Sequence, residues 1–161
     1  MSLDATVWCD CFEKGKLREP PPPGVLLRVE PSGFLTFNDA ELPVETEIAM
    51  DQWRERRACK HPGCRLLHHR LGNIALIALL RSELKHEADR YPIICGKVLY
   101  SGIHAGDYLP LDTIPGLQRE LDQLRDFKCS GEEANKFMIA FHAQMCELVG
   151  AALSVSKPID F

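Results

Sequence analysis

The sequence lacks the features that mark several large classes of protein. It has no basic excess, because its 161 residues carry a formal net charge of −4, whereas a protein that binds nucleic acid through phosphates needs a positive field. Its first ten residues, MSLDATVWCD, include neither a basic segment nor a long apolar run, so no signal peptide is predicted. The longest apolar run, Ile74 to Leu80, is far shorter than the roughly 20 residues that span a bilayer. We therefore expect a soluble, cytoplasmic protein that contacts neither nucleic acid nor membrane.

Motifs that identify common enzymes are also absent. The sequence contains no Gly-x-Ser-x-Gly elbow, no Walker phosphate loop and no His-Glu-x-x-His zinc motif. The sequence motifs therefore indicate no particular reaction. Whether the protein is an enzyme stays open at this stage, with a non-enzymatic role favoured.

Strand patterns fall mainly in the N-terminal part of the chain. Alternating apolar residues over 3–12 predict a strand inside a sheet, and the β-prone runs 25–30 and 34–37 predict a hairpin. A further strand is predicted over 93–100. The four prolines at 20–23 cannot pair in a sheet, and they predict a stiff surface loop, with a ligand for an aromatic groove as the alternative.

Helical patterns dominate the rest of the chain. Helices are predicted over 45–58 with Thr46 as N-cap, over 70–90, over 113–126, and from a capping box of Ser130 and Glu133 towards the C-terminus. Together these elements predict a single α+β domain over residues 1–161. Its small, mainly antiparallel sheet would carry about four helices packed on one face.

Seven cysteines and six histidines are the most distinctive part of the composition. An odd number of cysteines without an export signal predicts reduced thiols rather than a disulfide framework. Four potential zinc ligands, Cys59, His61, Cys64 and His68, fall within ten residues around a Pro-Gly turn. Cys9 and Cys11 could complete such a site from the neighbouring strand.

A structural interpretation of the same residues is also open. The ligand spacing matches no standard zinc motif, and Cys9 and Cys11 share a predicted strand face with apolar residues. On this interpretation, Cys59 and Cys64 pack beneath a turn and His68 lies at the start of a helix. No cofactor is then expected, and zinc remains the possible exception.

A second candidate site is the glycine-containing loop that follows the predicted strand 93–100. It offers Tyr100, Ser101, His104, Asp107 and Tyr108. His104 and Asp107 are three residues apart, so the carboxylate could orient the imidazole as a general base. Loops of this kind also form binding surfaces. The alternative is a turn whose glycines serve only the backbone.

Three segments carry a resemblance to known proteins. LDATVWCDCFEKGKLREPPPP, HHRLGNIALIALLRSEL and YSGIHAGDYL resemble a group of small, uncharacterised bacterial proteins. In layout the chain is also similar to immunity proteins of polymorphic toxin systems, which are small, acidic α+β domains. That resemblance implies a cytosolic protein-binding role, and it would place the residue 100–108 loop at the interface.

Two hypotheses follow from these observations. The first is an acidic, non-enzymatic interaction domain of the immunity type, whose charge favours a basic protein partner. The second is a zinc-binding domain or small metalloenzyme built on Cys59, His61, Cys64 and His68. The oligomeric state stays open.

Overall fold

The structure is a computed structural model that describes residues 2–37, 43–100, 104 and 106–161. Along the chain its strands and helices are β1 (Ser2–Trp8), β2 (Leu27–Val29), β3 (Leu35–Phe37), α1 (Val44–Arg56), η1 (Pro62–Cys64), β4 (Arg65–Asn73), α2 (Ile74–Leu84), η2 (Lys85–Arg90), η3 (Ile94–Val98), β5 (Tyr108–Leu109), η4 (Leu111–Thr113), α3 (Ile114–Leu124), α4 (Glu132–Val155) and β6 (Ile159–Asp160).

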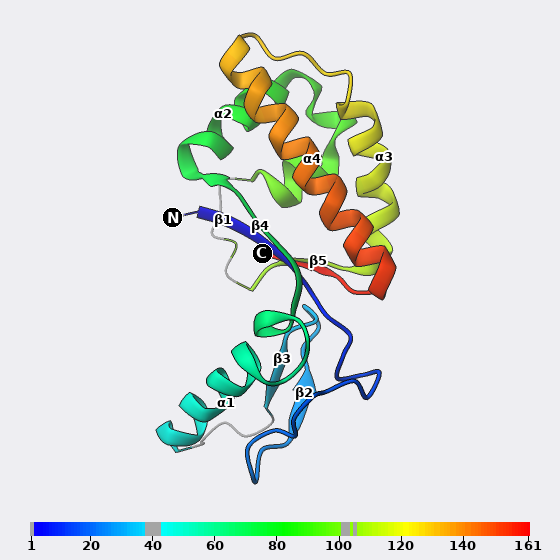
Figure 1. Cartoon of the computed structure of the whole chain (residues 1–161). Helices are drawn as coiled ribbons and strands as arrows, with labels where there is room; N and C mark the ends of the chain where they lie inside the picture. Colours follow the sequence, from blue (N-terminus) through cyan, green and yellow to red (C-terminus); the bar gives the residue numbers. More distant parts are fainter. Residues whose placement is uncertain (1, 38–42, 101–103, 105) are drawn as a thin grey trace.

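The larger part of the molecule, the helical lobe, combines a four-stranded sheet with α2, α3 and α4 (Figure 1). The strand order is β4-β1-β6-β5, and every pair is antiparallel. β1 is therefore interior, as its pattern predicts, and Leu3, Ala5 and Val7 are buried beneath the helices. The predicted α+β class with a mainly antiparallel sheet is confirmed.

Two helices supply most of the core of this lobe. The predicted stripe of α3 is buried through Leu117, Leu121 and Leu124. α4 buries seven of its residues along one stripe: Ala134, Met138, Phe141, Met145, Leu148, Val149 and Ala152. Among the described residues, α4 is long and apolar enough to cross a membrane, but its stripe packs into the domain core.

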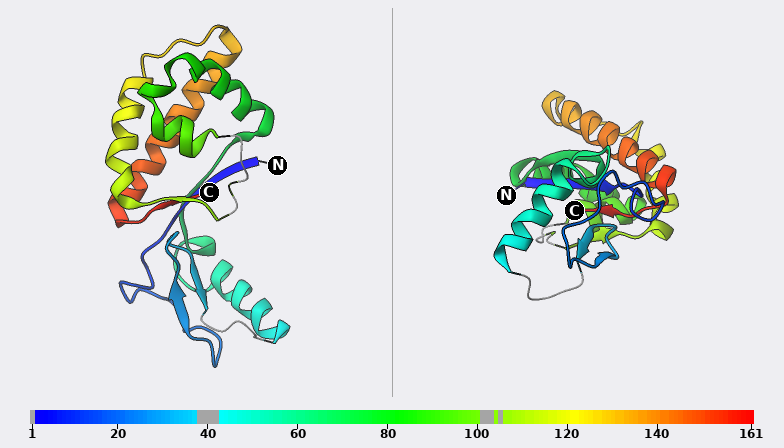
Figure 2. Two further views of the ribbon diagram at one scale, coloured as in Figure 1. Left: turned by 180° about the vertical axis from the view of Figure 1, so that it is seen from behind. Right: turned by 60° about the horizontal axis from the view of Figure 1, so that its bottom comes forward.

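The smaller part, the insertion lobe, consists of residues 9–64, which lie between β1 and β4 (Figures 1 and 2). It contains the predicted β2–β3 hairpin, α1 and the proline-rich segment. Its core is separate from that of the helical lobe and comprises Cys9, Cys11, Val25, Leu35, Met50, Trp53, Ala58, Cys59 and Cys64. The described α-helices thus divide between two cores, with α1 in the second and α2, α3 and α4 in the first.

Residues 93–100 were predicted as a strand, and this prediction is wrong. Residues 94–98 form the helical turn η3 instead. The buried carboxylate of Glu120 on α3 accepts hydrogen bonds from the amides of Ile93 at 2.9 Å and Ile94 at 2.8 Å. These bonds satisfy amides that a helix start leaves without partners. A contact 26 residues away in sequence therefore overrides the β-prone composition.

The helix predicted over 70–90 also differs. Residues 65–73 belong to β4, which pairs with β1 along its length, and α2 begins only at Ile74. Asn73 is the N-cap, because its Oδ1 accepts a hydrogen bond from the Leu76 amide at 2.9 Å. The asparagine marks the change from strand to helix rather than an interruption within a helix.

Two predicted helix caps are also wrong. α1 begins after Pro43, and Thr46 lies inside the helix. α4 begins after Gly131 without a side-chain cap, and Ser130 bonds to Glu83 of α2 through its hydroxyl at 2.6 Å and its amide at 2.7 Å. Ser130 therefore joins two helices instead of capping one.

Candidate metal centre

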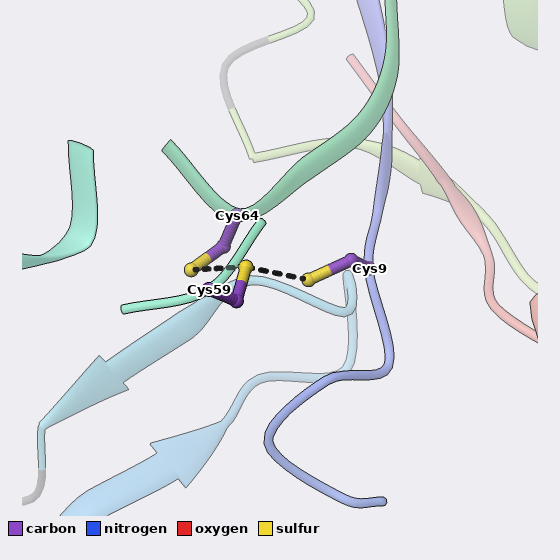
Figure 3. Close-up of side chains that lie close together, drawn as sticks. All are labelled: Cys9, Cys59 and Cys64. Atoms are coloured by element: carbon purple, nitrogen blue, oxygen red, sulfur yellow. Dashed lines mark hydrogen bonds between the residues drawn. The ribbon is translucent and has the colours of Figure 1, made fainter. Parts of the chain in front are cut away.

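Three buried cysteine sulfurs meet at the junction of the two lobes (Figure 3). The Sγ atoms of Cys9 and Cys59 are 3.6 Å apart, and those of Cys59 and Cys64 are 4.0 Å apart. All three sulfurs lie within 4.8 Å of one another. This cluster could hold a metal ion.

The pairing of β1 with β4 explains why residues 9 and 64 meet. Trp8 is opposite Arg65 in the register, and the Cys9 amide donates to the Cys64 carbonyl at 2.8 Å. Cys9 follows the end of one strand and Cys64 precedes the start of the other. Their closeness is therefore a consequence of the antiparallel ladder.

A tight turn brings Cys64 back towards Cys59. Gly63 and Cys64 both have left-handed backbone angles, with φ of 61° and 60°. The Cys64 amide closes the turn on the His61 carbonyl at 2.9 Å. A left-handed conformation costs a residue with a Cβ about 1–2 kcal/mol, so the turn holds Cys64 in an unfavourable conformation that directs its thiol at Cys59.

Cys11 is a further buried thiol near these three, outside the group whose sulfurs all lie within 4.8 Å of one another. It is buried in the same core, and the neighbouring thiols of Cys9 and Cys59 influence its pKa. It reaches this position two residues after Cys9, where the chain turns and the Lys16 amide donates to the Cys11 carbonyl at 2.7 Å.

Three of these thiols, those of Cys9, Cys11 and Cys59, have raised pKa values. Burial is the main cause for Cys59, whose pKa rises to about 11. The hydrogen bond with Cys64 and burial raise the pKa of Cys9, and burial raises that of Cys11. The thiols of Cys9, Cys11 and Cys59 thus favour the protonated form at pH 7. A thiolate is the metal-binding form, so an ion would have to displace protons on binding.

Backbone amides point at two of the sulfurs. The His61 amide donates to Cys59 Sγ at 3.4 Å, and the Cys11 amide hydrogen-bonds to Cys9 Sγ and lowers its pKa. In both cases the amide lies two residues after its cysteine. Such bonds favour the thiolate over the thiol, so the backbone is arranged to support charge on these sulfurs.

The structure unites only part of the predicted metal set. Cys59 and Cys64 come together, and Cys9, the residue after β1, joins them as the sequence allowed. Within the described ranges, neither His61 nor His68 belongs to the cluster. His68 lies on β4 rather than on a helix, and its Nδ1 is 3.0 Å from Thr6 Oγ1 of β1. The strand pairing that brings Cys9 to Cys64 thus also holds His68 beside Thr6, outside the cluster.

Of the predicted interaction loop, Ser101 is outside the described residues, and Tyr108 lies on β5, where it pairs with Asp160 of β6. The Tyr100 hydroxyl donates to Asp107. The His104 ring packs against Tyr100 and Phe161, with ring centres 4.3 and 5.6 Å away. Burial lowers the pKa of His104, and its Nδ1 is 3.7 Å from Asp107. That separation is too long for the orienting hydrogen bond of a general base.

A groove of about 360 Å³ lies beside the thiol cluster. Its lining includes the aromatic rings of Trp8 and Phe34 and charged side chains of both signs: Asp51, Arg54, Glu55, Arg56 and Arg65. The Arg54 guanidinium lies 4.4 Å above the Phe34 ring. Sequence patterns gave no sign of this groove, because its residues come from β1, the β2–β3 hairpin, α1 and the start of β4.

Comparison of the chain with protein-family models, curated proteins and solved structures found no match. The site must therefore be interpreted from its own geometry.

Proposed function

We propose that the protein binds one structural zinc ion through the thiolates of Cys9, Cys11, Cys59 and Cys64. The observation that carries this proposal is the convergence of three buried sulfurs within 4.8 Å of one another. Zinc–sulfur bonds of about 2.3 Å in a tetrahedron place the sulfurs about 3.8 Å apart. The separations of 3.6 and 4.0 Å bracket that value.

The donor set supports a structural rather than a catalytic role. Four thiolates fill a tetrahedral zinc ion, whereas a catalytic zinc site keeps one position for water or substrate. All four cysteines are also buried, which limits access to the centre. The proposal is therefore non-enzymatic, in agreement with the absence of catalytic motifs from the sequence.

The insertion lobe has a small apolar core that a bound ion would stabilise. Of the nine buried residues that form its core, four are cysteines. Small units with little apolar surface are commonly stabilised by a metal or by disulfides, because their cores alone supply only a few kcal/mol. A zinc–thiolate centre would supply stabilising free energy that the small apolar core does not provide.

The test is the metal content of untagged protein purified under reducing conditions. We expect one zinc per chain by elemental analysis and by native mass spectrometry. Replacement by Co²⁺ should give the intense visible absorption of tetrahedral thiolate coordination. The Cys59→Ser variant should lose the metal, while Cys146→Ser, at an exposed thiol on α4, should retain it. Folded wild-type protein that takes up neither metal would refute the proposal.

The identity of the fourth ligand can be tested separately. Cys11→Ser should weaken zinc binding strongly, whereas His61→Ala should leave the stoichiometry at one. The reverse result would keep the zinc site but transfer the fourth position to His61, the ligand that the sequence spacing predicts.

We propose a protein-binding role as the second candidate, because the groove beside the cluster supports one. Tryptophan and arginine are enriched among the residues that dominate binding energy at protein interfaces, and this groove presents Trp8 with three arginines. The acidic composition predicts a basic partner. Within the groove Arg54 pairs with Asp51 and Arg65 with Glu55, so Arg56 is the arginine that we expect to contact a carboxylate of that partner. A purified partner should bind the wild type but lose at least tenfold in affinity with Arg56→Glu. Unchanged affinity would exclude the groove.

A further inference from the structure

The insertion lobe is joined to the helical lobe at a narrow neck. The chain leaves β1 after Trp8 and returns to β4 at Arg65, and these two residues are paired in the ladder. The hydrogen bond from the Cys9 amide to the Cys64 carbonyl is the next step beyond that pair. Everything between residues 9 and 64 is thus a single insertion closed at its base (Figure 1).

The two lobes are stabilised by different cores. The core of the helical lobe contains residues of β1, β4, β5, β6 and the later helices, while that of the insertion lobe contains only residues 9–64. Within the part of the chain that the structure describes, Leu66 is the one partly buried residue that packs against both cores. The lobes also touch through the Trp8 and Phe34 rings and the Glu13–Lys157 ion pair. The buried residues of the two cores are nevertheless separate sets, so we expect the folding of one core to depend weakly on that of the other.

The thiol cluster lies at the base of the insertion and joins its separate segments. Cys9 comes from the chain leaving β1, Cys59 follows α1, and Cys64 ends the turn before β4 (Figure 3). Cys11 lies two residues beyond Cys9. The cluster also reaches α1 directly, because the Cys64 thiol donates to the Arg54 carbonyl at 3.9 Å. An ion bound here would displace the Cys64 proton that makes this bond, but it would fix the exit, the return and, through Cys59, the chain just after α1 at one point.

We propose that the metal controls the folding of residues 9–64 as one unit, so that its loss unfolds the insertion lobe while the helical lobe stays folded. This inference rests on the proposed zinc site and extends it to a conformational switch. The groove lined by Trp8, Phe34 and the arginines belongs largely to the insertion, so it would be formed only in the metal-bound protein. Any partner that uses the groove would then bind in a zinc-dependent way.

The experiment is hydrogen exchange of the full-length chain, followed by mass spectrometry of peptides, under reducing conditions. One sample carries zinc, a second is stripped with a chelator, and a third is stripped and reloaded. Metal content is measured in all three, so the presence of the zinc site is established independently of its effect on folding. We expect peptides from 9–64 to lose at least tenfold in protection on stripping and to regain it on reloading. Peptides from α3 and α4 should change by less than twofold.

Two results would overturn the switch while leaving the zinc site intact. One is loss of protection throughout the chain on stripping, which would make the molecule a single cooperative unit. The other is unchanged protection of 9–64 in protein shown to have lost its metal. If the loaded sample holds no zinc at all, the proposed function fails first and the switch fails with it.

Tryptophan fluorescence gives a second readout that needs no variant. Both tryptophans, Trp8 and Trp53, lie at the neck or inside the insertion lobe. Stripping should therefore shift the emission to longer wavelength, while far-ultraviolet circular dichroism should retain the helical signal of α2, α3 and α4. Coincident loss of both signals would contradict the switch.

Discussion

The indole nitrogen of Trp8 donates a hydrogen bond to Asp160 Oδ2 at 2.7 Å, across 152 positions of sequence. This bond joins the end of β1 to the last strand, β6, beside the neck of the insertion lobe. Burial raises the pKa of Asp160 despite the opposing effect of the Trp8 hydrogen bond. The contact is therefore formed at some electrostatic cost whenever the carboxyl group is ionised.

The raised pKa of Asp160 predicts a specific dependence of stability on pH. A folded-state pKa above the unfolded value, about 3.9 for aspartate, favours folding while the group is protonated, and this contribution is lost as pH rises through the folded pKa. Asp160→Asn keeps an acceptor for Trp8 without the charge. We expect the variant to be at least as stable as the wild type at pH 7, with the difference shrinking as pH falls towards 3.

Urea unfolding at a series of pH values measures this difference. Asp160→Ala is the control, because it leaves the Trp8 donor without an acceptor and should cost about 1–3 kcal/mol. A wild type that is clearly more stable than Asp160→Asn at pH 7 would show that the carboxylate is not penalised by burial.

Removal of one thiol from the proposed zinc site should be far more costly than removal of an unrelated one. Structural zinc contributes on the order of 10 kcal/mol of apparent binding free energy. Cys64→Ser should therefore lose the metal and most of the stability of the insertion lobe. Cys146→Ser, on the exposed part of α4, should change the free energy of unfolding by less than about 0.5 kcal/mol. Equal effects of the two variants in urea titrations would argue against bound metal.

Gly63, the glycine of the turn before β4, is expected to tolerate substitution poorly. Its φ is 61°, and a Cβ there would lie 2.7 Å from Glu55 Oε2. Gly63→Ala should cost at least about 1 kcal/mol and should lower zinc affinity by displacing Cys64.

Gly150 supplies the matched control for that substitution. It lies inside α4, and a Cβ added there would meet no atom within 4 Å beyond the backbone of its own helix, so Gly150→Ala should stabilise the protein by up to about 1 kcal/mol. Calorimetry of the two variants, zinc-loaded, should show Tm shifts of opposite sign. Shifts of the same sign would mean that the turn tolerates a side chain.

Glu120 should be essential for η3. Its buried carboxylate accepts hydrogen bonds from the backbone amides of Ile93 and Ile94. Glu120→Gln retains one acceptor oxygen, and Glu120→Ala leaves both amides without a partner. We expect losses of about 1–3 kcal/mol for the alanine variant and a smaller loss for glutamine. Faster amide exchange at residues 93–98 would locate the effect, and equal stability of both variants with the wild type would contradict it.

The periodic helices were predictable because local spacing and burial agree. Leu117, Leu121 and Leu124 recur along one face of α3, and burial of that face needs only a nearby core. The strand predicted over 93–100 failed for the opposite reason. Its residues suit a strand or a buried helix equally well, and the hydrogen bonds from Glu120 decide between them.

The candidate site was likewise predictable from the sequence only in part. The sequence by itself determined the kinds of ligand available, the α+β class and the turn at Pro62-Gly63. Only the tertiary structure decided which ligands meet. The antiparallel pairing of β1 with β4 places Cys9 against Cys64 and Cys59, and it places His68 beside Thr6 instead. Register is set by which face of each strand is buried, and spacing within one segment carries no information about that pairing.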